Sequence, residues 1–422
     1  MKGTTTAAIE FRQELRITTA GLERGMFVSE LDRPWLGSGF AFEGVLVESD
    51  DDLRRIQAMC RHVSVDIARG KAPSPHHVVF DTESQAEIAA PVVPPTSSGP
   101  FRSILSRVFG AETVAAEKAH ETLEAGVRDV MDGLRTGGKL DADKLREGVD
   151  TMLDSITRNP TALPWVMEMR RKGDYVYQHG IACSIWAAAF GRHLGLERDD
   201  LRDLALGALL CDVGKVRLPD SLLSKVGAID DEDRRRLRSH VDESRSIIDQ
   251  TPGLSTVVHQ IVEHHHERHD GSGYPAGLQG AGIPMFARIA GMVDSYDAMV
   301  SQRPYARVRS PHEAVMELYE TRDKLFQAEL VEQFIRTCGV YPTGTLVELS
   351  DGTVGVVMSV NTLKRLRPSV MLILGPDKQP LAEFRLVDLA EVANDANGAP
   401  LNVRGGLPAG AYGVDRAALF LD

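Results

Sequence analysis

The chain has 422 residues, 43% of them hydrophobic and 26% charged, and a formal net charge of −12. This composition is typical of a soluble globular protein with two to four domains. The acidic balance argues against general binding of nucleic-acid polymers, which needs a basic surface, but it allows a local cationic pocket for a phosphate. The cysteines form no close pair, which argues against a CxxC zinc site or a disulfide framework and favours a reducing compartment.

The sequence indicates neither export nor membrane insertion. Residues 1–13 are polar and lack the apolar core of a signal peptide. The most apolar short run, residues 181–190, is too short to span a bilayer. We therefore expect a cytoplasmic protein without a membrane partner.

Residues 9–70 are predicted to form a small α+β module. A helix is expected at 53–60, and short apolar runs favour strands at 15–17, 25–28, 44–47 and 63–65. Residues 71–110 follow as a predicted linker. Its six prolines among Ser, Thr and Ala leave too little apolar surface to order the segment.

Residues 111–340 carry a helical pattern and are predicted to form an all-α bundle. Apolar residues recur at three- and four-residue spacing, and helices are expected at 114–134, 201–210, 230–249 and 284–300. The last of these begins with Pro284, which favours the first turn of a helix.

After residue 340 the pattern changes to period-two runs. Asp351-Gly352 lies between two such runs and predicts a β-hairpin. Residues 341–422 are therefore expected to form a small β-rich appendage. The predicted protein is multidomain and mainly α, with a central helical bundle between a small N-terminal α+β module and this appendage.

The densest chemical signal lies at 259–269, where five of the 13 histidines fall within eleven residues. Neutral imidazole is the commonest protein ligand for transition metals. A single histidine would more often be structural. Here adjacent histidines run directly into the Gly/Pro-rich turn 271–277, which favours a metal site over incidental histidines.

Four further side chains in the helical region could converge on such a site: His179, Asp212, His240 and Asp294. Taken singly, these histidines and Asp294 would more often be structural or solvated. Together with the paired histidines they form a mixed His/carboxylate set, which suits Fe, Mn or Zn, whereas Mg or Ca prefers oxygen ligands. A carboxylate that bridges two metals supports phosphoester hydrolysis.

Asp212 is the hardest of these to explain as structural, because an unpaired carboxylate at the end of an apolar helix is costly. Lys215 follows three residues later. It either complements the end of a helix or reaches a bound phosphate as a point charge.

Residues 211–215, Cys-Asp-Val-Gly-Lys, resemble the His-Asp-x-Gly-Lys segment of the HD phosphohydrolase superfamily. Residues 264–278, together with 283–284, 287–289, 293–298 and 303–305, are similar to its HD-GYP subfamily of bacterial cyclic di-GMP phosphodiesterases. Residues 32–36 and 65–66 resemble a module often fused ahead of such domains. The resemblance implies an HD-type all-α bundle that hydrolyses cyclic di-GMP to linear pGpG, and it leaves open whether cleavage continues to GMP.

The resemblance also implies a two-metal centre with Fe or Mn, or alternatively Zn. Its implied ligands are His179, Asp212, His240, His265, His266 and Asp294. Asp212 would bridge the ions, while His264, which precedes the histidine pair, is not an expected ligand. Asp212 and Lys215 are the implied catalytic residues, the former holding a hydroxide and the latter near the scissile phosphate.

The implied substrate site is formed by a loop and a cation. Gly273, Tyr274 and Pro275 would shape the nucleotide site, and Arg303 would contact a ligand phosphate, for which an Arg fork is suited. Cyclic di-GMP is thus the implied partner, and the flanking modules suggest contacts with other signalling proteins. The sequence carries no signal for an oligomeric state.

Three departures from the family pattern affect this interpretation. The histidine that defines the superfamily is Cys211 here, and two interpretations stay open: a thiolate ligand with a longer bond, or a small buried apolar residue. Tyr175 stands where members with three metals carry Glu, so a third metal is not expected. Ala306 stands where Lys is frequent, which removes one phosphate contact.

Three functions are compatible with these residues. The first is a metal-dependent cyclic di-GMP phosphodiesterase whose rate the change at Cys211 would reduce. The second is a cyclic di-GMP receptor that binds the ligand through the retained loop without turnover. The third is an HD hydrolase that acts on another phosphoester. The sequence favours the first.

Overall fold

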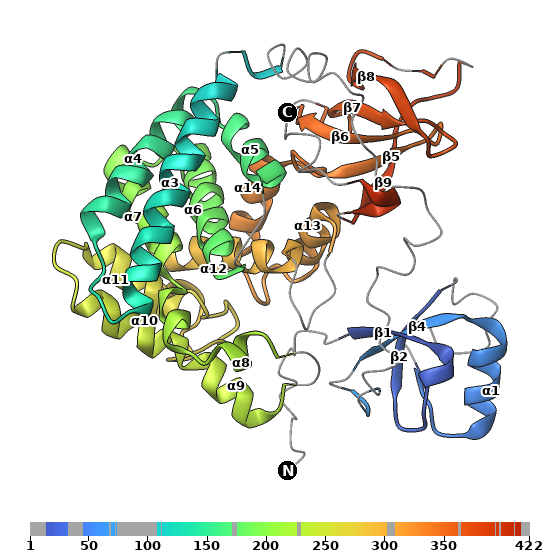
Figure 1. Ribbon diagram of the computed structural model, residues 1–422, viewed down its shortest axis with the longest axis horizontal. Helices are drawn as coiled ribbons and strands as arrows, with labels where there is room; N and C mark the ends of the chain where they lie inside the picture. Colours follow the sequence, from blue (N-terminus) through green and yellow to red (C-terminus); the bar gives the residue numbers. More distant parts are fainter. Residues whose placement is uncertain are drawn as a thin grey trace. The chain divides into compact units, whose positions relative to one another are not determined.

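The structure is a computed structural model (Figure 1). It describes residues 14–32, 45–66, 69–71, 73, 108–110, 112–170, 175–225, 229–301, 309–361, 364–392, 394–395, 398–408 and 410–414. Most of the predicted linker and Arg303 therefore lie outside the described residues. Backbone contacts divide the chain into two compact units, one around an N-terminal sheet and one around a helical bundle. Each unit is described by itself.

The N-terminal unit contains a four-stranded antiparallel sheet in the order β1-β4-β2-β3. The elements are β1 (Glu14–Thr18), η1 (Thr19–Gly21), β2 (Phe27–Leu31), β3 (Val45–Leu46), α1 (Asp50–Met59) and β4 (His62–Asp66). Ser49 and Asp52 form a capping box that starts α1. Ile56 of this helix packs with strand residues such as Val28 and Val65. The predicted small α+β fold of this region is confirmed.

The helical unit is built around α6, which is buried along most of its length and contacts α3, α4, α5, α7, α12 and α14 (Figure 1). The early helices are α3 (Glu112–Arg135), α4 (Ala142–Arg158), α5 (Ala162–Arg170), α6 (Tyr175–His193) and α7 (Arg198–Leu210). After η3 (Val213–Arg217), this unit continues with α10 (His240–Asp249) and α11 (Thr256–His264). The intervening α8 (Asp220–Leu223) and nearly all of α9 (Asp231–Arg238) are grouped with the other unit. After η4 (Gly280–Gly282) come α12 (Met285–Val300), α13 (Pro311–Glu320) and α14 (Ala328–Cys338).

The helix predicted at 230–249 is two helices, so that prediction was wrong in one respect. The chain breaks at Ser239, between α9 and α10. The charged α9 buries none of its residues, whereas α10 buries an apolar stripe that includes Val241, Ile247 and Ile248. The break places His240, itself buried, as the first residue of a packed helix.

The C-terminal strands form a five-stranded antiparallel sheet in the order β8-β7-β6-β5-β9. They are β5 (Leu346–Leu349), β6 (Val354–Ser359), β7 (Ser369–Leu374), β8 (Pro380–Asp388) and β9 (Val403–Leu407), before η5 (Ala411–Gly413). The predicted hairpin at Asp351-Gly352 joins β5 to β6, and Gly352 has the positive φ of 85° that such a turn favours.

This sheet packs against the helical bundle and shares a hydrophobic core with it, so it is not a separate appendage. Val356 and Met371 on one face belong to the same hydrophobic core as the helices. Val357 and Leu372 on the other face form a separate small core. The sheet and the helices therefore fold as parts of one compact unit.

Candidate metal centre

The four side chains Asp212, His240, His265 and His266 form the triple-histidine group, whose candidate ligand atoms all lie within 4.8 Å of one another. His240 begins α10, and His265 is the C-cap residue of α11. Oδ1 of Asp212 lies 3.0 Å from Nε2 of His240 and 3.9 Å from Nε2 of His265. The structure thus brings together four residues that are spread over more than fifty positions of the sequence.

The ring nitrogens of this group face one another without enough protons to form hydrogen bonds, as expected for a site that binds a cation. Nδ1 of His265 lies 3.0 Å from the carbonyl of Val262 and therefore carries the proton, so Nε2 is left as a lone pair. This buried Nε2 has no hydrogen-bond partner among the described residues. Nε2 of His266 and Nε2 of His240 lie only 3.1 Å apart, and they face each other as two acceptors unless one is protonated.

The electrostatic environment keeps two of these imidazoles neutral. Burial lowers the pKa of His265 to about 4. Burial, helped by the neighbouring imidazoles and Arg268, also holds the pKa of His266 well below its usual value. Neutral imidazole is the form that binds metals, so the residues present fit a divalent transition metal.

His179, Cys183 and Asp294 form a second set, the sulfur-containing group, which is completely or almost completely buried. Nε2 of His179 lies 2.9 Å from Oδ1 of Asp294 and 3.4 Å from Oδ2 of Asp212. Burial acts to raise the pKa of Asp294, but the hydrogen bond and charge of His179 outweigh it and lower that pKa to about 2. The aspartate is therefore a charged ligand candidate.

Asp297 orients the imidazole of this second group and was not predicted as a site residue. Its fully buried carboxylate accepts a hydrogen bond from Nδ1 of His179 at 2.7 Å and another from Ser301 at 3.0 Å. This contact leaves Nε2 of His179 free to bind a metal, as carboxylates do beside many metal-bound histidines. The signal available in the sequence was its position three residues after Asp294, on the same face of α12.

Asp212 connects the two groups because its two carboxylate oxygens point in different directions. Oδ1 faces His240 and His265, whereas Oδ2 faces His179 and also pairs with Lys215. Burial acts to raise the pKa of Asp212, but Lys215 and His240 hold it well below its usual value. The carboxylate has the placement of a bridging ligand.

Two close packing contacts hold these ligands in position. A Cβ atom on Gly214 would lie 2.3 Å from the carbonyl of His240, so only glycine lets η3 pack against the start of α10. Ser244 of α10 locks the same turn, because its hydroxyl accepts from the backbone of Gly214 at 2.8 Å and donates to the carbonyl of Cys211 at 2.9 Å. These contacts fix Asp212 beside His240.

Cys211, the residue at the altered motif position, belongs to neither ligand group within the described chain. Its buried thiol donates to the carbonyl of Ala208 at 3.3 Å, one turn back along α7. Burial raises the pKa of this thiol well above its usual value. Of the two interpretations of Cys211, this geometry favours the small buried residue.

The predicted nucleotide loop lies directly against the triple-histidine group. Gly273 passes so close to the chain that an added Cβ would lie 2.4 Å from the backbone nitrogen of Arg268. The ring of Tyr274 stacks on the ring of His266, with centroids 4.6 Å apart, and precedes Pro275. The guanidinium of Arg238 lies over the Tyr274 ring, 4.7 Å from its centroid.

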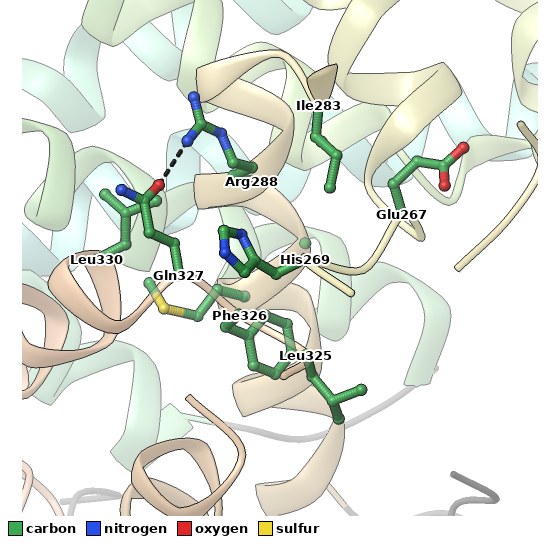
Figure 2. Close-up of a pocket in the computed structure, with 10 residues that line it drawn as sticks. Glu267, His269, Ile283, Arg288, Leu325, Phe326, Gln327 and Leu330 are labelled. Carbon is green, nitrogen blue, oxygen red and sulfur yellow. Dashed lines mark hydrogen bonds between the residues drawn. The ribbon is translucent and has the colours of Figure 1, made fainter. Parts of the chain in front are cut away.

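Glu267 ties this loop to the metal ligands, and it was also missed as a functional residue. Its carboxylate accepts hydrogen bonds from the backbone nitrogens of Ala276 and Leu278, at 2.7 and 2.9 Å. In Figure 2 the carboxylate turns away from the other labelled side chains of a small pocket. That pocket, which includes Arg288 hydrogen-bonded to Gln327, is lined by no predicted ligand.

Comparison with known proteins agrees with this geometry. An HD domain model matches residues 161–330, and a model for a domain of unknown function, DUF3391, matches residues 14–145. The chain is 30% identical over 380 residues to the cyclic di-GMP phosphodiesterase PA4108 of Pseudomonas aeruginosa, covering 89% of this chain and 88% of that protein. The chain belongs to the HD-GYP family of phosphodiesterases. The predicted family membership is confirmed.

Other HD-GYP relatives match over a smaller part of the chain. The cyclic di-GMP phosphodiesterase response regulator RpfG of Xanthomonas campestris is 32% identical over 38% of this chain and 44% of its own length. The 3'3'-cGAMP-specific phosphodiesterase 1 of Vibrio cholerae is 33% identical over 34% of this chain and 33% of its own length. Among the described residues, no helix is long and apolar enough to cross a membrane.

Proposed function

We propose that this HD-GYP chain is a two-metal phosphodiesterase that hydrolyses cyclic di-GMP to linear pGpG, with GMP as the further product if cleavage continues. The observation that carries the proposal is the carboxylate of Asp212, which faces a ligand group on each side. The likeness to the Pseudomonas relative along almost the whole chain supports cyclic di-GMP as the substrate. The mixed imidazole and carboxylate donors support Fe or Mn, with Zn as an alternative.

The residues that would hold the ions are His240, His265 and His266 on one side and His179 and Asp294 on the other, with Asp212 between them. Divalent cations bound at such a site supply positive charge that activates a water and neutralises phosphate oxygens. Burial of the ligands excludes bulk water, which strengthens each electrostatic contact.

The remaining side chains act on the substrate or on the ligands. Lys215 lies beside Asp212 and carries a charge that can stabilise the phosphate as its negative charge develops. Asp297 keeps the proton of His179 on Nδ1, which fixes the direction of the ligand nitrogen. Gly273, Tyr274 and Pro275 shape the entrance for a nucleotide, with Arg303 as the expected phosphate contact.

A receptor without turnover is the second candidate, and Cys211 favours it. The thiol that replaces an imidazole is turned toward Ala208 instead of the ligand groups. If nothing else fills that position, the ion beside His179 is bound more weakly and hydrolysis is slow or absent. The loop beside His266 would still bind the ligand.

Turnover and binding assays separate the two candidates. The protein is purified anaerobically with Fe or Mn and incubated with cyclic di-GMP, with 3'3'-cGAMP as a comparison substrate, and the products are resolved by ion-pair chromatography. If the chain is this phosphodiesterase, pGpG should form, and its formation should stop in Asp212→Ala. Asp242→Ala is the control, because its exposed carboxylate lies on the same helix as His240, and this variant should still form pGpG. Tight binding of cyclic di-GMP without hydrolysis under Fe, Mn and Zn would establish the receptor instead.

A further inference from the structure

The sulfur-containing group includes a cysteine that the family pattern does not mark. Cys183 lies one helical turn after His179 on α6 and is fully buried. Its Sγ lies 3.8 Å from both ring nitrogens of His179. With Asp294 these atoms form a cluster of three different donors within 4.8 Å of one another.

These distances allow one ion to contact both the sulfur and the imidazole. Typical bonds are about 2.3 Å for zinc to sulfur and about 2.1 Å for zinc to imidazole, so two donors of one ion lie at most about 4.4 Å apart. The 3.8 Å between Sγ of Cys183 and Nε2 of His179 is shorter than that limit, but Sγ lies equally far from Nδ1, so the thiol must rotate toward the Nε2 side of the ring to share an ion with that nitrogen. Oδ1 of Asp294, 2.9 Å from the same Nε2, completes a converging set.

The two ligand groups differ in how many imidazoles they contain. Within the described chain, Oδ1 of Asp212 faces His240 and His265, with His266 in the same group, whereas the one imidazole beside Oδ2 is that of His179. The position from which a second imidazole would be expected is Cys211, whose thiol points to Ala208. A further donor is therefore needed on the side of His179, and Cys183 is the donor atom that lies there.

We propose that Cys183 is a thiolate ligand of the metal ion bound by His179 and Asp294, in place of the imidazole missing at position 211. On binding, the sulfur–hydrogen bond breaks, a sulfur–metal bond forms, and the proton passes to solvent, with no change of oxidation state. The inference rests on the two-metal centre of the proposed function. Because sulfur is a soft donor, this site prefers Fe or Zn to Mn more strongly than an all-imidazole and carboxylate site does.

Cobalt(II) added to metal-free protein under anaerobic conditions tests the inference without nucleotide or turnover. We expect two equivalents of cobalt to bind and a sulfur-to-cobalt charge-transfer band to appear in the near ultraviolet. In Cys183→Ser the band should disappear and one of the two equivalents should be lost, because the sulfur-containing group no longer holds its ion. Cys338→Ser removes a buried thiol of α14 and should change neither reading.

A second variant keeps the test decisive if Cys183→Ser does not fold. In the triple variant Cys60→Ser, Cys211→Ser and Cys338→Ser, Cys183 is the only cysteine left, and the band should persist. Loss of the band there, or its loss in Cys211→Ser alone, would overturn the inference. Two bound cobalt ions without any band would also overturn it and leave the two-metal centre standing. Failure to bind cobalt would instead overturn the two-metal centre itself.

Discussion

The triple-histidine group and the sulfur-containing group lie on either side of Asp212 but are built in different ways. Two ligands of the first, His265 and His266, are adjacent in sequence at the end of α11. The ligands of the second come from the buried helices α6 and α12. A local motif thus specifies two of the four members of one group, whereas the other depends on how two long helices pack.

The two groups therefore differ in what a substitution removes. A substitution in the histidine pair removes one of the four candidate donors of its group. In the sulfur-containing group, the packed helices α6 and α12 bring the buried donors of His179, Cys183 and Asp294 together. If the two groups are separate sites that share one carboxylate, a substitution in one group should leave the other intact.

The largest effect is expected from Asp212→Ala, because this change removes the carboxylate that serves both groups. Loss of the bridging charge should cost several kcal/mol in the transition state, or about a 10³-fold fall in kcat. Metal analysis should show weaker binding of both metal equivalents. A substitution in a single group should weaken the binding of only one. Retention of either equivalent at full affinity would contradict the view of Asp212 as a shared ligand.

The metal-free protein should respond to pH in opposite directions at the two groups. Burial lowers the pKa of His265 to about 4, so between about pH 6.5 and 4 the unfolded chain binds the proton that the folded chain excludes, and stability falls as the pH falls. The full loss from this residue is about 3 kcal/mol, at 1.36 kcal/mol per pKa unit.

The pKa of His179 is shifted in the opposite direction, so its effect on stability has the opposite pH dependence. Burial acts to lower its pKa, but Cys183, Tyr175 and the carboxylates around it hold the pKa well above the usual value. The stability that this histidine contributes is complete below about pH 6.5 and is lost as the pH rises through its folded pKa. Urea unfolding of metal-free protein should show a shallower acid limb in His265→Gln and a shallower alkaline limb in His179→Gln. Changes on the same limb in both variants would argue against two distinct environments.

Asp297→Asn should weaken one group only. The substitution keeps the shape of the side chain but removes the charge that accepts from Nδ1 of His179. Loss of such an orienting partner typically reduces metal affinity about 10- to 100-fold. Competition with a chelator should show this fall for one equivalent and none for the other. Ser301→Ala, which removes a second donor to the same carboxylate, is the control and should have a much smaller effect.

The contrast between a local motif and helix packing also explains which site residues the sequence could predict. Asp212, His265 and His266 lie in short motifs, and the family resemblance implies that they converge. Cys183 and Asp297 are each one turn from a predicted ligand. The contact of Cys183 with His179 lies within α6, whereas the contact of Asp297 with His179 depends on the packing of α12 against α6. The break at Ser239 was missed because the apolar stripe of α10 was read as continuing through the charged α9.

The smallest expected effect lies at the edge of the triple-histidine group. The guanidinium of Arg238 lies over the ring of Tyr274, which in turn stacks on His266. An exposed cation–π contact contributes about 0.5–1 kcal/mol. Arg238→Ala should therefore loosen the nucleotide loop and raise KM for cyclic di-GMP about two- to fivefold, with kcat and the metal content unchanged. Arg245→Ala, which removes an exposed arginine of α10 paired with Glu263, is the matched control and should leave KM unchanged. A fall in kcat for Arg238→Ala would mean that the stack positions His266 itself and not only the loop that covers it.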